Sequence, residues 1–215
     1  MTKKTTHKKI PMLLKIALLL TLALLIWIAS GYFGSRAEKL PYTVISQNKD
    51  YEIRQLPTHL IAQTTVSGNF DQASNQAFNI LASYIFGENQ KKQPIAMTAP
   101  VIESQPIAMT APVLSTETQK NQRNFSFVMP SKYTLETLPE PLDPRISIQQ
   151  IEAQKIAVLS FSGFYSEKKI EAKKELLKNY LNRDKLEYST LSWAGYNPPW
   201  TPPFMRRLEV WAELK

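Results

Sequence analysis

The stretch that decides the fold is Tyr-Glu-Ile-Arg-Gln-Leu-Pro-Thr-His-Leu-Ile-Ala-Gln-Thr-Thr-Val-Ser-Gly, residues 51–68. A stretch of the same pattern, Ile-Ser-Ile-Gln-Gln-Ile-Glu-Ala-Gln-Lys-Ile-Ala-Val-Leu-Ser-Phe-Ser-Gly, follows 95 residues later at 146–163. Identical pairs across this shift include Ile53 and Ile148, Gln55 and Gln150, Ile61 and Ile156, Ala62 and Ala157, Ser67 and Ser162, and Gly68 and Gly163. Each stretch predicts a short strand, a turn, and a longer strand that ends in Ser-Gly.

A helix is predicted after each pair of strands. The first covers about Asp71 to Phe86, with Asp71 as its N-cap and Gly87 as its stop. Its apolar residues recur at helical spacing, at Ala73, Ala77, Ile80, Leu81, Tyr84 and Ile85. The second helix covers about Ser166 to Leu181. Strands are predicted at 51–56, 60–67, 125–129, 146–151, 155–162, 187–196 and 208–214.

These elements predict an α+β domain over residues 40–215 with pseudo-twofold symmetry. Its halves cover about residues 42–130 and 146–215. We expect the strands to meet as a distorted antiparallel β-barrel, flanked by the two helices.

The N-terminal region predicts a membrane anchor. No charged residue occurs from Ile16 to Ser35, and about twenty apolar residues suffice for a helix to span a bilayer. The segment is apolar on every face, which excludes an ordinary core helix. The lysines before it, within the basic stretch 1–15, favour a cytoplasmic N-terminus. Trp27, Tyr32 and Phe33 would then lie at the far interface.

The alternative is a cleaved signal peptide, with Ser35-Arg36-Ala37 as the cleavage region. The long apolar segment and the aromatic residues after it favour an uncleaved anchor. Either way, we expect the folded domain on the extracytoplasmic side of a bacterial cytoplasmic (inner) membrane, which the uncleaved chain would cross once.

Composition excludes several classes of function. The chain has no cysteine, so thiolate metal sites, disulfides and a cysteine nucleophile are excluded. The formal charge of +8 does not indicate nucleic-acid binding, because six basic residues and no acidic one lie within residues 1–37. No Ser-His-Asp arrangement or glycine-rich phosphate loop can be assembled, so we expect a protein that is not an enzyme.

The nonamer Gln-Pro-Ile-Ala-Met-Thr-Ala-Pro-Val occurs twice, at residues 93–101 and 105–113. Each copy has two prolines, and proline removes a backbone donor, so neither copy is expected in a helix interior or a central strand. The predicted form is an extended loop that presents Ile, Met and Val side chains. It either covers or binds an apolar surface, or is a local duplication in a tolerant loop.

The order of short motifs along the chain resembles the SOUL/heme-binding protein (HEBP) family, in its membrane-anchored bacterial type. The matching pieces are Tyr51-Glu52-Ile53-Arg54, the Ile-Ala-Met-Thr-Ala-Pro-Val motif in both copies, Phe127-Val128-Met129-Pro130-Ser131, Leu142-Asp143-Pro144-Arg145, Phe161-Ser162-Gly163, Ala194-Gly195-Tyr196-Asn197-Pro198-Pro199 and Arg206-Arg207-Leu208-Glu209-Val210-Trp211. The resemblance covers about residues 40–215. It implies two βαββ units, and some family members bind heme or other tetrapyrroles.

Heme needs an apolar slot and cations for its propionates, and it often has an axial ligand. Phe78, Leu81, Met97 and Met109 are candidates for the slot, although Leu81 also fits a core position. Ile85 is a further candidate for the slot, and Met97, Met109, Met129 and Tyr196 are candidates for weak ligation. Arg54, Arg206 and Arg207 are the candidate cations, although an arginine in a strand is more often solvated.

The axial ligand is the weakest part of this hypothesis. In family members with a proposed histidine ligand, that histidine directly follows the Tyr-Glu-Ile-Arg motif, whereas this chain has Gln55 there. His59 is the one histidine of the domain and a weak candidate metal ligand, since a histidine in a turn is more often a surface residue. Heme could also bind through apolar contacts and ion pairs alone.

Two hypotheses of function follow. The first is a membrane-anchored binding protein for heme or a similar planar hydrophobic ligand, acting as a buffer, carrier or sensor. The second is a membrane-tethered protein-interaction module without a cofactor. Its contacts would come from the proline-rich loops, including Asn-Pro-Pro-Trp-Thr-Pro-Pro-Phe at 197–204. In that loop, Trp200 and Phe204 could instead stack on a flat ligand or close the end of the barrel.

Overall fold

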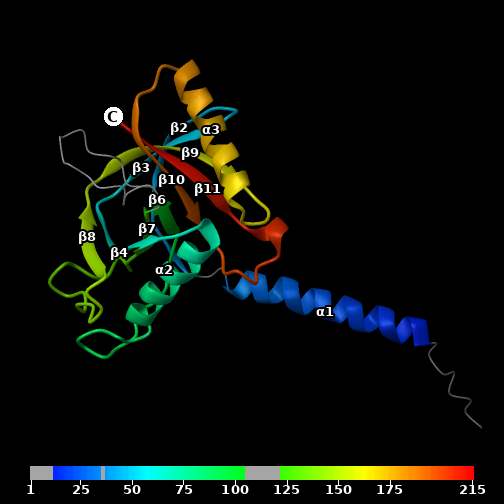
Figure 1. Ribbon diagram of the computed structural model, residues 1–215. Coiled ribbons are helices and arrows are strands. Elements are labelled where there is room, and N and C mark those ends of the chain that lie inside the picture. The colour runs from blue at the N-terminus through cyan, green and yellow to red at the C-terminus, as the bar shows by residue number, and fades with distance from the viewer. Residues whose placement is uncertain (1–11, 35–36, 105–121) are drawn as a thin grey trace, which may run out of the picture.

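A computed structural model describes residues 12–34, 37–104 and 122–215 of the chain (Figure 1). The helices are α1 (Met12–Gly34), α2 (Phe70–Ile85) and α3 (Glu167–Arg183), with a short 3-10 helix η1 (Pro203–Met205). The strands are β1 (Glu38–Lys39), β2 (Thr43–Gln47), β3 (Glu52–Leu56), β4 (His59–Ser67), β5 (Thr98–Ala99), β6 (Val101–Ser104), β7 (Gln122–Val128), β8 (Ile146–Ile151), β9 (Gln154–Phe161), β10 (Tyr188–Gly195) and β11 (Leu208–Leu214).

Nine strands form one antiparallel sheet in the order β2-β3-β9-β11-β10-β6-β7-β4-β8. The α+β class is therefore confirmed, but the expected barrel is wrong, because the two end strands β2 and β8 do not pair with each other among the described residues. All five residues of β2 are exposed, so this strand has no buried face to drive closure. The short β1 and β5 form a separate parallel pair.

Strand pairing links the two halves of the chain. The short strand of each repeated stretch pairs with the long strand of the other half, so β3 lies beside β9 and β8 lies beside β4. Among the eight strands other than the edge strand β2, the central pairing is that of β6 with β10. The pseudo-twofold repeat itself stays a prediction.

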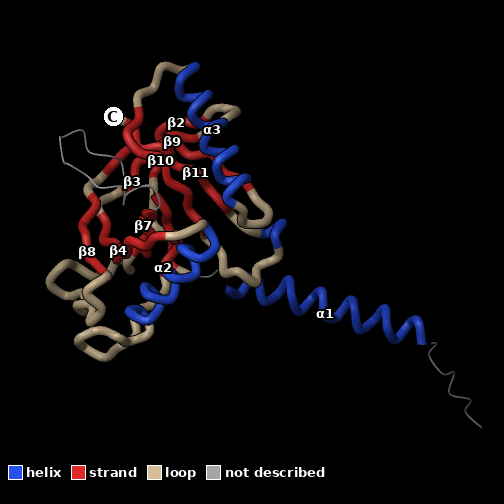
Figure 2. The backbone as a smooth tube through the Cα atoms, viewed as in Figure 1, coloured by secondary structure: helices blue, strands red, loops and turns tan. Residues whose placement is uncertain are grey.

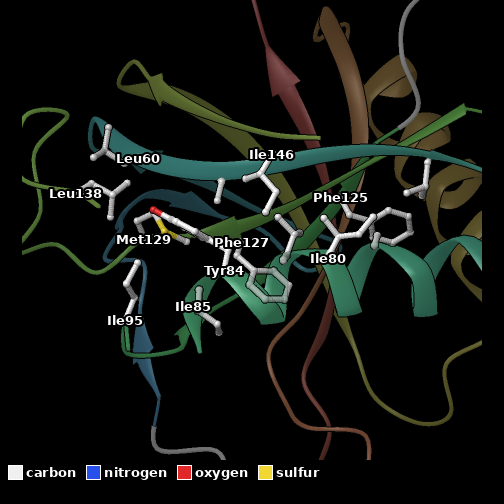
Figure 3. Packing of buried hydrophobic residues seen from close by; sticks show 14 of the residues in the cluster. Leu60, Ile80, Tyr84, Ile85, Ile95, Phe125, Phe127, Met129, Leu138 and Ile146 are labelled. Atoms are coloured by element: carbon white, nitrogen blue, oxygen red, sulfur yellow. The ribbon is translucent and has the colours of Figure 1, made fainter. Parts of the chain in front are cut away.

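Two helices cover the sheet (Figure 2). Helix α2 packs on β4 and β7, and α3 packs on β9, β10 and β11. The apolar spacing predicted for α2 is realised, because Ala73, Ala77 and Leu81 have no exposed surface. Figure 3 shows Ile80 and Tyr84 of this helix among the aromatic side chains of β7. Burial of such side chains typically contributes about 1.5–3 kcal/mol each and fixes α2 on the sheet.

The ends of α2 differ slightly from the prediction. Its N-cap is Asn69, whose side chain accepts a 3.0 Å hydrogen bond from the backbone N–H of Gln72. Asp71 is therefore not the cap but lies in the first turn, where a negative charge complements the helix dipole. Gly87 follows the C-cap Phe86 with a φ of 119°, so the predicted stop is confirmed.

The first proline-rich nonamer corrects another expectation. Val101, its last residue, opens β6, which lies between β10 and β7 in the middle of the sheet. Thr98 and Ala99 of the same copy form β5. A central strand is possible here because Pro100 immediately precedes β6 and therefore lies outside its hydrogen-bond ladder. The second copy, residues 105–113, lies outside the described residues.

Candidate functional site

Two adjoining cavities form an apolar groove between α2, β6, the end of β10 and the proline-rich loop at 197–202. Their volumes are about 290 and 300 Å³. Both are lined by Phe78, Val101, Gly195, Asn197 and Pro199, so the cavities adjoin. Each volume is at the lower end of the roughly 300–1,000 Å³ typical of small-molecule sites. We call the two cavities together the apolar groove.

Three of the predicted site residues line this groove, namely Phe78, Met97 and Tyr196. Phe78 is not among the buried residues of α2, and its ring packs edge-on against that of Phe127, with ring centroids 5.7 Å apart. Its side chain is still 42% exposed, so a ligand could cover it. The groove brings together an aromatic ring from α2, a thioether from the first nonamer, and a tyrosine that follows β10.

Two further aromatic side chains line the groove. Trp200 is 58% exposed and Phe86 is 75% exposed. The sequence predicts Trp200 as a stacking residue, whereas it marks Phe86 only as the end of a helix. The signal for Phe86 was available, since an aromatic residue at the C-cap falls outside the predicted apolar face of α2.

The charge of the groove is low. None of the residues lining the 290 Å³ cavity is charged, and Asp71 is the one charged residue lining its neighbour. The described lining therefore selects for an apolar surface rather than for an anionic group.

Arg54, a predicted propionate partner, lies in a buried ion-pair cluster instead. Its side chain is 3% exposed and pairs with Glu52 at 2.7 Å and with Glu209 at 3.0 Å. The guanidinium also stacks over the ring of Tyr42, with 4.2 Å from Cζ to the ring centroid. An incoming carboxylate would have to displace these partners, and burial leaves little access to them.

Glu209 of β11 is the centre of this cluster and was not identified from the sequence. It has no exposed surface, and its two oxygens accept hydrogen bonds from five side chains: Arg54, Ser160, Tyr196, Arg207 and Trp211. Burial alone would raise the pKa of this carboxyl, but the charges of Arg54 and Arg207, together with the donated hydrogen bonds, lower the pKa below its ordinary value. The carboxylate is therefore ionised at neutral pH.

Arg207 and Tyr196 connect this cluster to the groove. Arg207 pairs with Glu209 at 2.7 Å and stacks over the ring of Tyr196 at 4.1 Å. The hydroxyl of Tyr196 donates to Glu209, and burial followed by the nearby carboxylate charge raises the pKa of this tyrosine. Tyr196, which lines the groove, is thus held as a neutral donor to this cluster.

Arg206 holds the proline-rich loop. Its Nε donates to the carbonyl oxygen of Thr201 at 2.8 Å, and its Nη2 donates to that of Pro199 at 2.5 Å. The guanidinium also lies 4.8 Å from the ring centroid of Tyr165. The loop therefore has a fixed shape where it forms the wall of the groove.

The remaining predicted residues lie elsewhere. Leu81 has no exposed surface and belongs to the core beneath α2, as its alternative interpretation expected. Ile85 and Met129 belong to the same core. Met109 lies outside the described residues.

His59 borders a separate cavity of about 390 Å³. Its Nδ1 lies 2.8 Å from the carbonyl oxygen of Pro57, and burial lowers the pKa of its ring. Within residues 12–34, 37–104 and 122–215, no group of three or more His, Asp or Glu side chains is arranged to hold a metal ion.

Comparison with known sequences decides the family. The sequence model of the SOUL heme-binding protein family matches residues 37–213. The chain belongs to the SOUL heme-binding protein family. It is 31% identical to human Heme-binding protein 2 over 176 residues, which cover 80% of this chain and 82% of that protein. It is also 31% identical to Heme-binding protein 1 of Xenopus tropicalis over 166 residues, covering 75% and 82%.

Solved structures with little sequence identity share the fold of this SOUL domain. The C-terminal domain of EcmrR aligns with a TM-score of 0.58 at 8% identity, covering 81% of this chain and 98% of that domain. A hydrolase from Listeria innocua aligns with a TM-score of 0.52 at 11% identity, covering 80% and 94%. At such identities the likeness concerns the fold alone.

Proposed function

We propose that this SOUL family member is a membrane-anchored protein that binds heme or a similar planar hydrophobic tetrapyrrole. The apolar groove is the observation that carries this proposal. Its described walls are apolar and aromatic, and relatives in the family have the names of heme-binding proteins. Because these relatives are named as binding proteins, buffering, transport or sensing of the ligand are the proposed roles.

The groove residues fit the ring of a tetrapyrrole better than its iron. The exposed rings of Phe78, Phe86 and Trp200 offer aromatic surface for stacking on a flat ring. Met97 supplies a thioether in the same lining, whereas the hydroxyl of Tyr196 is already donated to Glu209. When bound, heme would supply redox or ligand-binding chemistry at its iron, and the protein would supply an apolar enclosure.

For the propionates we propose Arg206 and Arg207 rather than Arg54. Both side chains are partly exposed, and each contacts a residue that lines the groove. Arg54 lies behind them with 3% of its side chain exposed. We therefore propose that Arg54 maintains the buried cluster and makes no contact with ligand.

Helix α1 is the proposed anchor. It has 23 residues, which is about 34 Å at 1.5 Å per residue, and its most apolar stretch, Met12–Tyr32, has a mean hydropathy of 2.5. This length spans the roughly 30 Å hydrocarbon core of a bilayer. The preceding lysines support a cytoplasmic N-terminus, so we propose that the domain lies on the periplasmic or extracytoplasmic side of the inner membrane.

We further propose that the domain consists of two pseudo-symmetric βαββ halves. Apart from the edge strand β2, the order β3-β9-β11-β10-β6-β7-β4-β8 supports this, because exchanging corresponding strands of the two halves gives the same order read from the opposite edge of the sheet. Ligand binding in the apolar groove does not require this symmetry between the two halves.

The test is a hemin titration of the full chain in lipid nanodiscs, followed by absorbance, with empty nanodiscs subtracted. We expect a saturable one-to-one shift of the Soret band. Phe78→Glu should weaken binding at least tenfold, about 1.4 kcal/mol, because the charge would lie in the apolar groove. Leu142→Glu is the matched control, since Leu142 is also an exposed apolar residue, at 60%, but does not line the groove. Non-saturable uptake that both variants leave unchanged would contradict the proposal and favour an interaction module without a cofactor.

A further inference from the structure

The end of α1 nearest the domain packs directly on the proline-rich loop. Trp27 Nε1 donates a 2.8 Å hydrogen bond to the carbonyl oxygen of Trp200, 173 residues away in sequence. Gly31 is buried against the same loop, and a Cβ at this position would lie 2.6 Å from Pro202 Cδ. Figure 1 shows this loop against the last turns of α1, while the other end of the helix points away from the domain.

This contact determines where along the axis of α1 the proline-rich loop lies. From Met12 to Gly31 the helix rises about 28 Å, close to the roughly 30 Å thickness of a hydrocarbon core. If α1 spans the bilayer from near Met12, the boundary between hydrocarbon and headgroups falls near the turn that contacts the loop. The loop then lies at the height of the membrane interface.

Three exposed aromatic side chains lie on the proline-rich loop or on the turn bonded to it. Phe164 is 71% exposed, Trp200 is 58% exposed and Phe204 is 66% exposed. We call these three residues the aromatic rim. Soluble surfaces rarely gather large apolar side chains without a partner, and aromatic residues concentrate at membrane interfaces.

The aromatic rim is held together by bonds between the turn around residue 164 and the proline-rich loop. The backbone N–H of Gly163 donates to Pro203 at 2.9 Å, and the hydroxyl of Tyr165 donates to the carbonyl oxygen of Asn197 at 2.9 Å. The guanidinium of Arg206 lies 6.0 Å from the ring centroid of Phe164 and donates to the loop. These bonds hold the turn and the loop, which carry the three aromatic side chains, next to each other.

We propose that the aromatic rim is a membrane-contact surface, which seats the domain in the interfacial region of the same bilayer that α1 crosses. The bilayer is favoured over a protein partner because the rim is continuous with the contact between α1 and the loop. This inference rests on the anchor in the proposed function, since α1 must span the membrane for the rim to reach it.

The test uses site-directed spin labelling, because the chain has no cysteine of its own. Single variants Phe164→Cys and Phe204→Cys place a nitroxide on the rim. Leu142→Cys is the control on another exposed apolar residue, and Leu20→Cys reports on α1, where Leu20 is 67% exposed. Each full-length variant is reconstituted in vesicles of phosphatidylethanolamine and phosphatidylglycerol. Collision of the label with oxygen, which dissolves in the bilayer, is compared with collision with a water-soluble nickel chelate.

We expect the ratio of oxygen collisions to nickel collisions to be several-fold higher for the labels at 164, 204 and 20 than for the label at 142. Rim labels that behave like the label at 142, with residue 20 embedded, would overturn the rim proposal and leave the anchor intact. A water-exposed label at residue 20 would overturn both. Two rim positions are used so that a variant that fails to fold, judged by circular dichroism, leaves the other to decide.

Discussion

The hydroxyl of Tyr196 donates a 2.8 Å hydrogen bond to Oε2 of Glu209, and this bond joins the wall of the apolar groove to a carboxylate with no exposed surface. Tyr196 therefore cannot tilt toward a ligand without leaving a buried charge short of a donor. The same carboxylate pairs with both Arg54 and Arg207. The shape of the groove thus depends on electrostatics in the sheet behind it.

Replacing this carboxylate should lower the free energy of unfolding of the domain. In Glu209→Gln, the guanidiniums of Arg54 and Arg207 lose their shared counter-ion inside the protein. Breaking a buried pair typically costs about 3–5 kcal/mol. Urea unfolding of the detergent-solubilised chain, followed by tryptophan fluorescence, should show this loss. Glu213→Gln, on the same strand but partly exposed, should change the free energy of unfolding by less than about 1 kcal/mol.

The same carboxylate should make stability depend on pH. The pKa of Glu209 is lower in the folded protein than its ordinary value of 4.5, so the folded state binds this proton less readily than the unfolded state. Its contribution is complete above about pH 4.5 and is lost as the pH falls through the lower, folded pKa. The difference in unfolding free energy between wild type and Glu209→Gln should therefore shrink below pH 4.5. A difference that stays constant from pH 7 to pH 3 would contradict this assignment.

Restoring the family histidine should not improve binding of hemin. Gln55 lies on β3, where it pairs with Lys155 of β9, and it lines neither cavity of the groove. We expect Gln55→His to leave the affinity within about twofold of wild type and the Soret maximum unchanged, measured in the same nanodisc titration. Tighter binding with a shifted maximum would place the ligand on the β3 side of the sheet instead.

The propionate assignment can be separated from a structural role of the arginines. The double variant Arg206→Ala and Arg207→Ala should lose at least tenfold in affinity for hemin. It should bind the hemin dimethyl ester nearly as well as the wild type does, because the ester has no free carboxylate for an ion pair. An equal loss for both ligands would mean that Arg206 and Arg207 act only by holding the loop and Tyr196.

Some elements were predictable because their pattern is local. β8 and β11 begin and end at the predicted residues, since each has a short apolar pattern between clear turns. β2 was not predicted because all of its residues are exposed and no alternation marks it. β6 was not predicted because the prolines of the nonamer suggested a loop, although Pro100 stops just before the strand.

The site was predictable only in part for a related reason. Met97 and Tyr196 lie in the family motifs and Phe78 lies on the predicted first helix, and the structure gathers all three in one groove. The ion pair between Arg54 and Glu209 joins residues 155 positions apart and depends on β9 lying between β3 and β11. No pattern within either strand reports that pairing, so Arg54 looked like a free cation in the sequence.

Trp200 belongs both to the groove and to the aromatic rim. With the rim seated in the bilayer, a hydrophobic ligand would reach the groove by lateral diffusion in the lipid rather than by collision from the aqueous phase. The occupancy of the protein would then follow the amount of ligand dissolved per area of membrane. An affinity expressed per volume of buffer would contain the partition coefficient of the ligand as well as its fit to the groove.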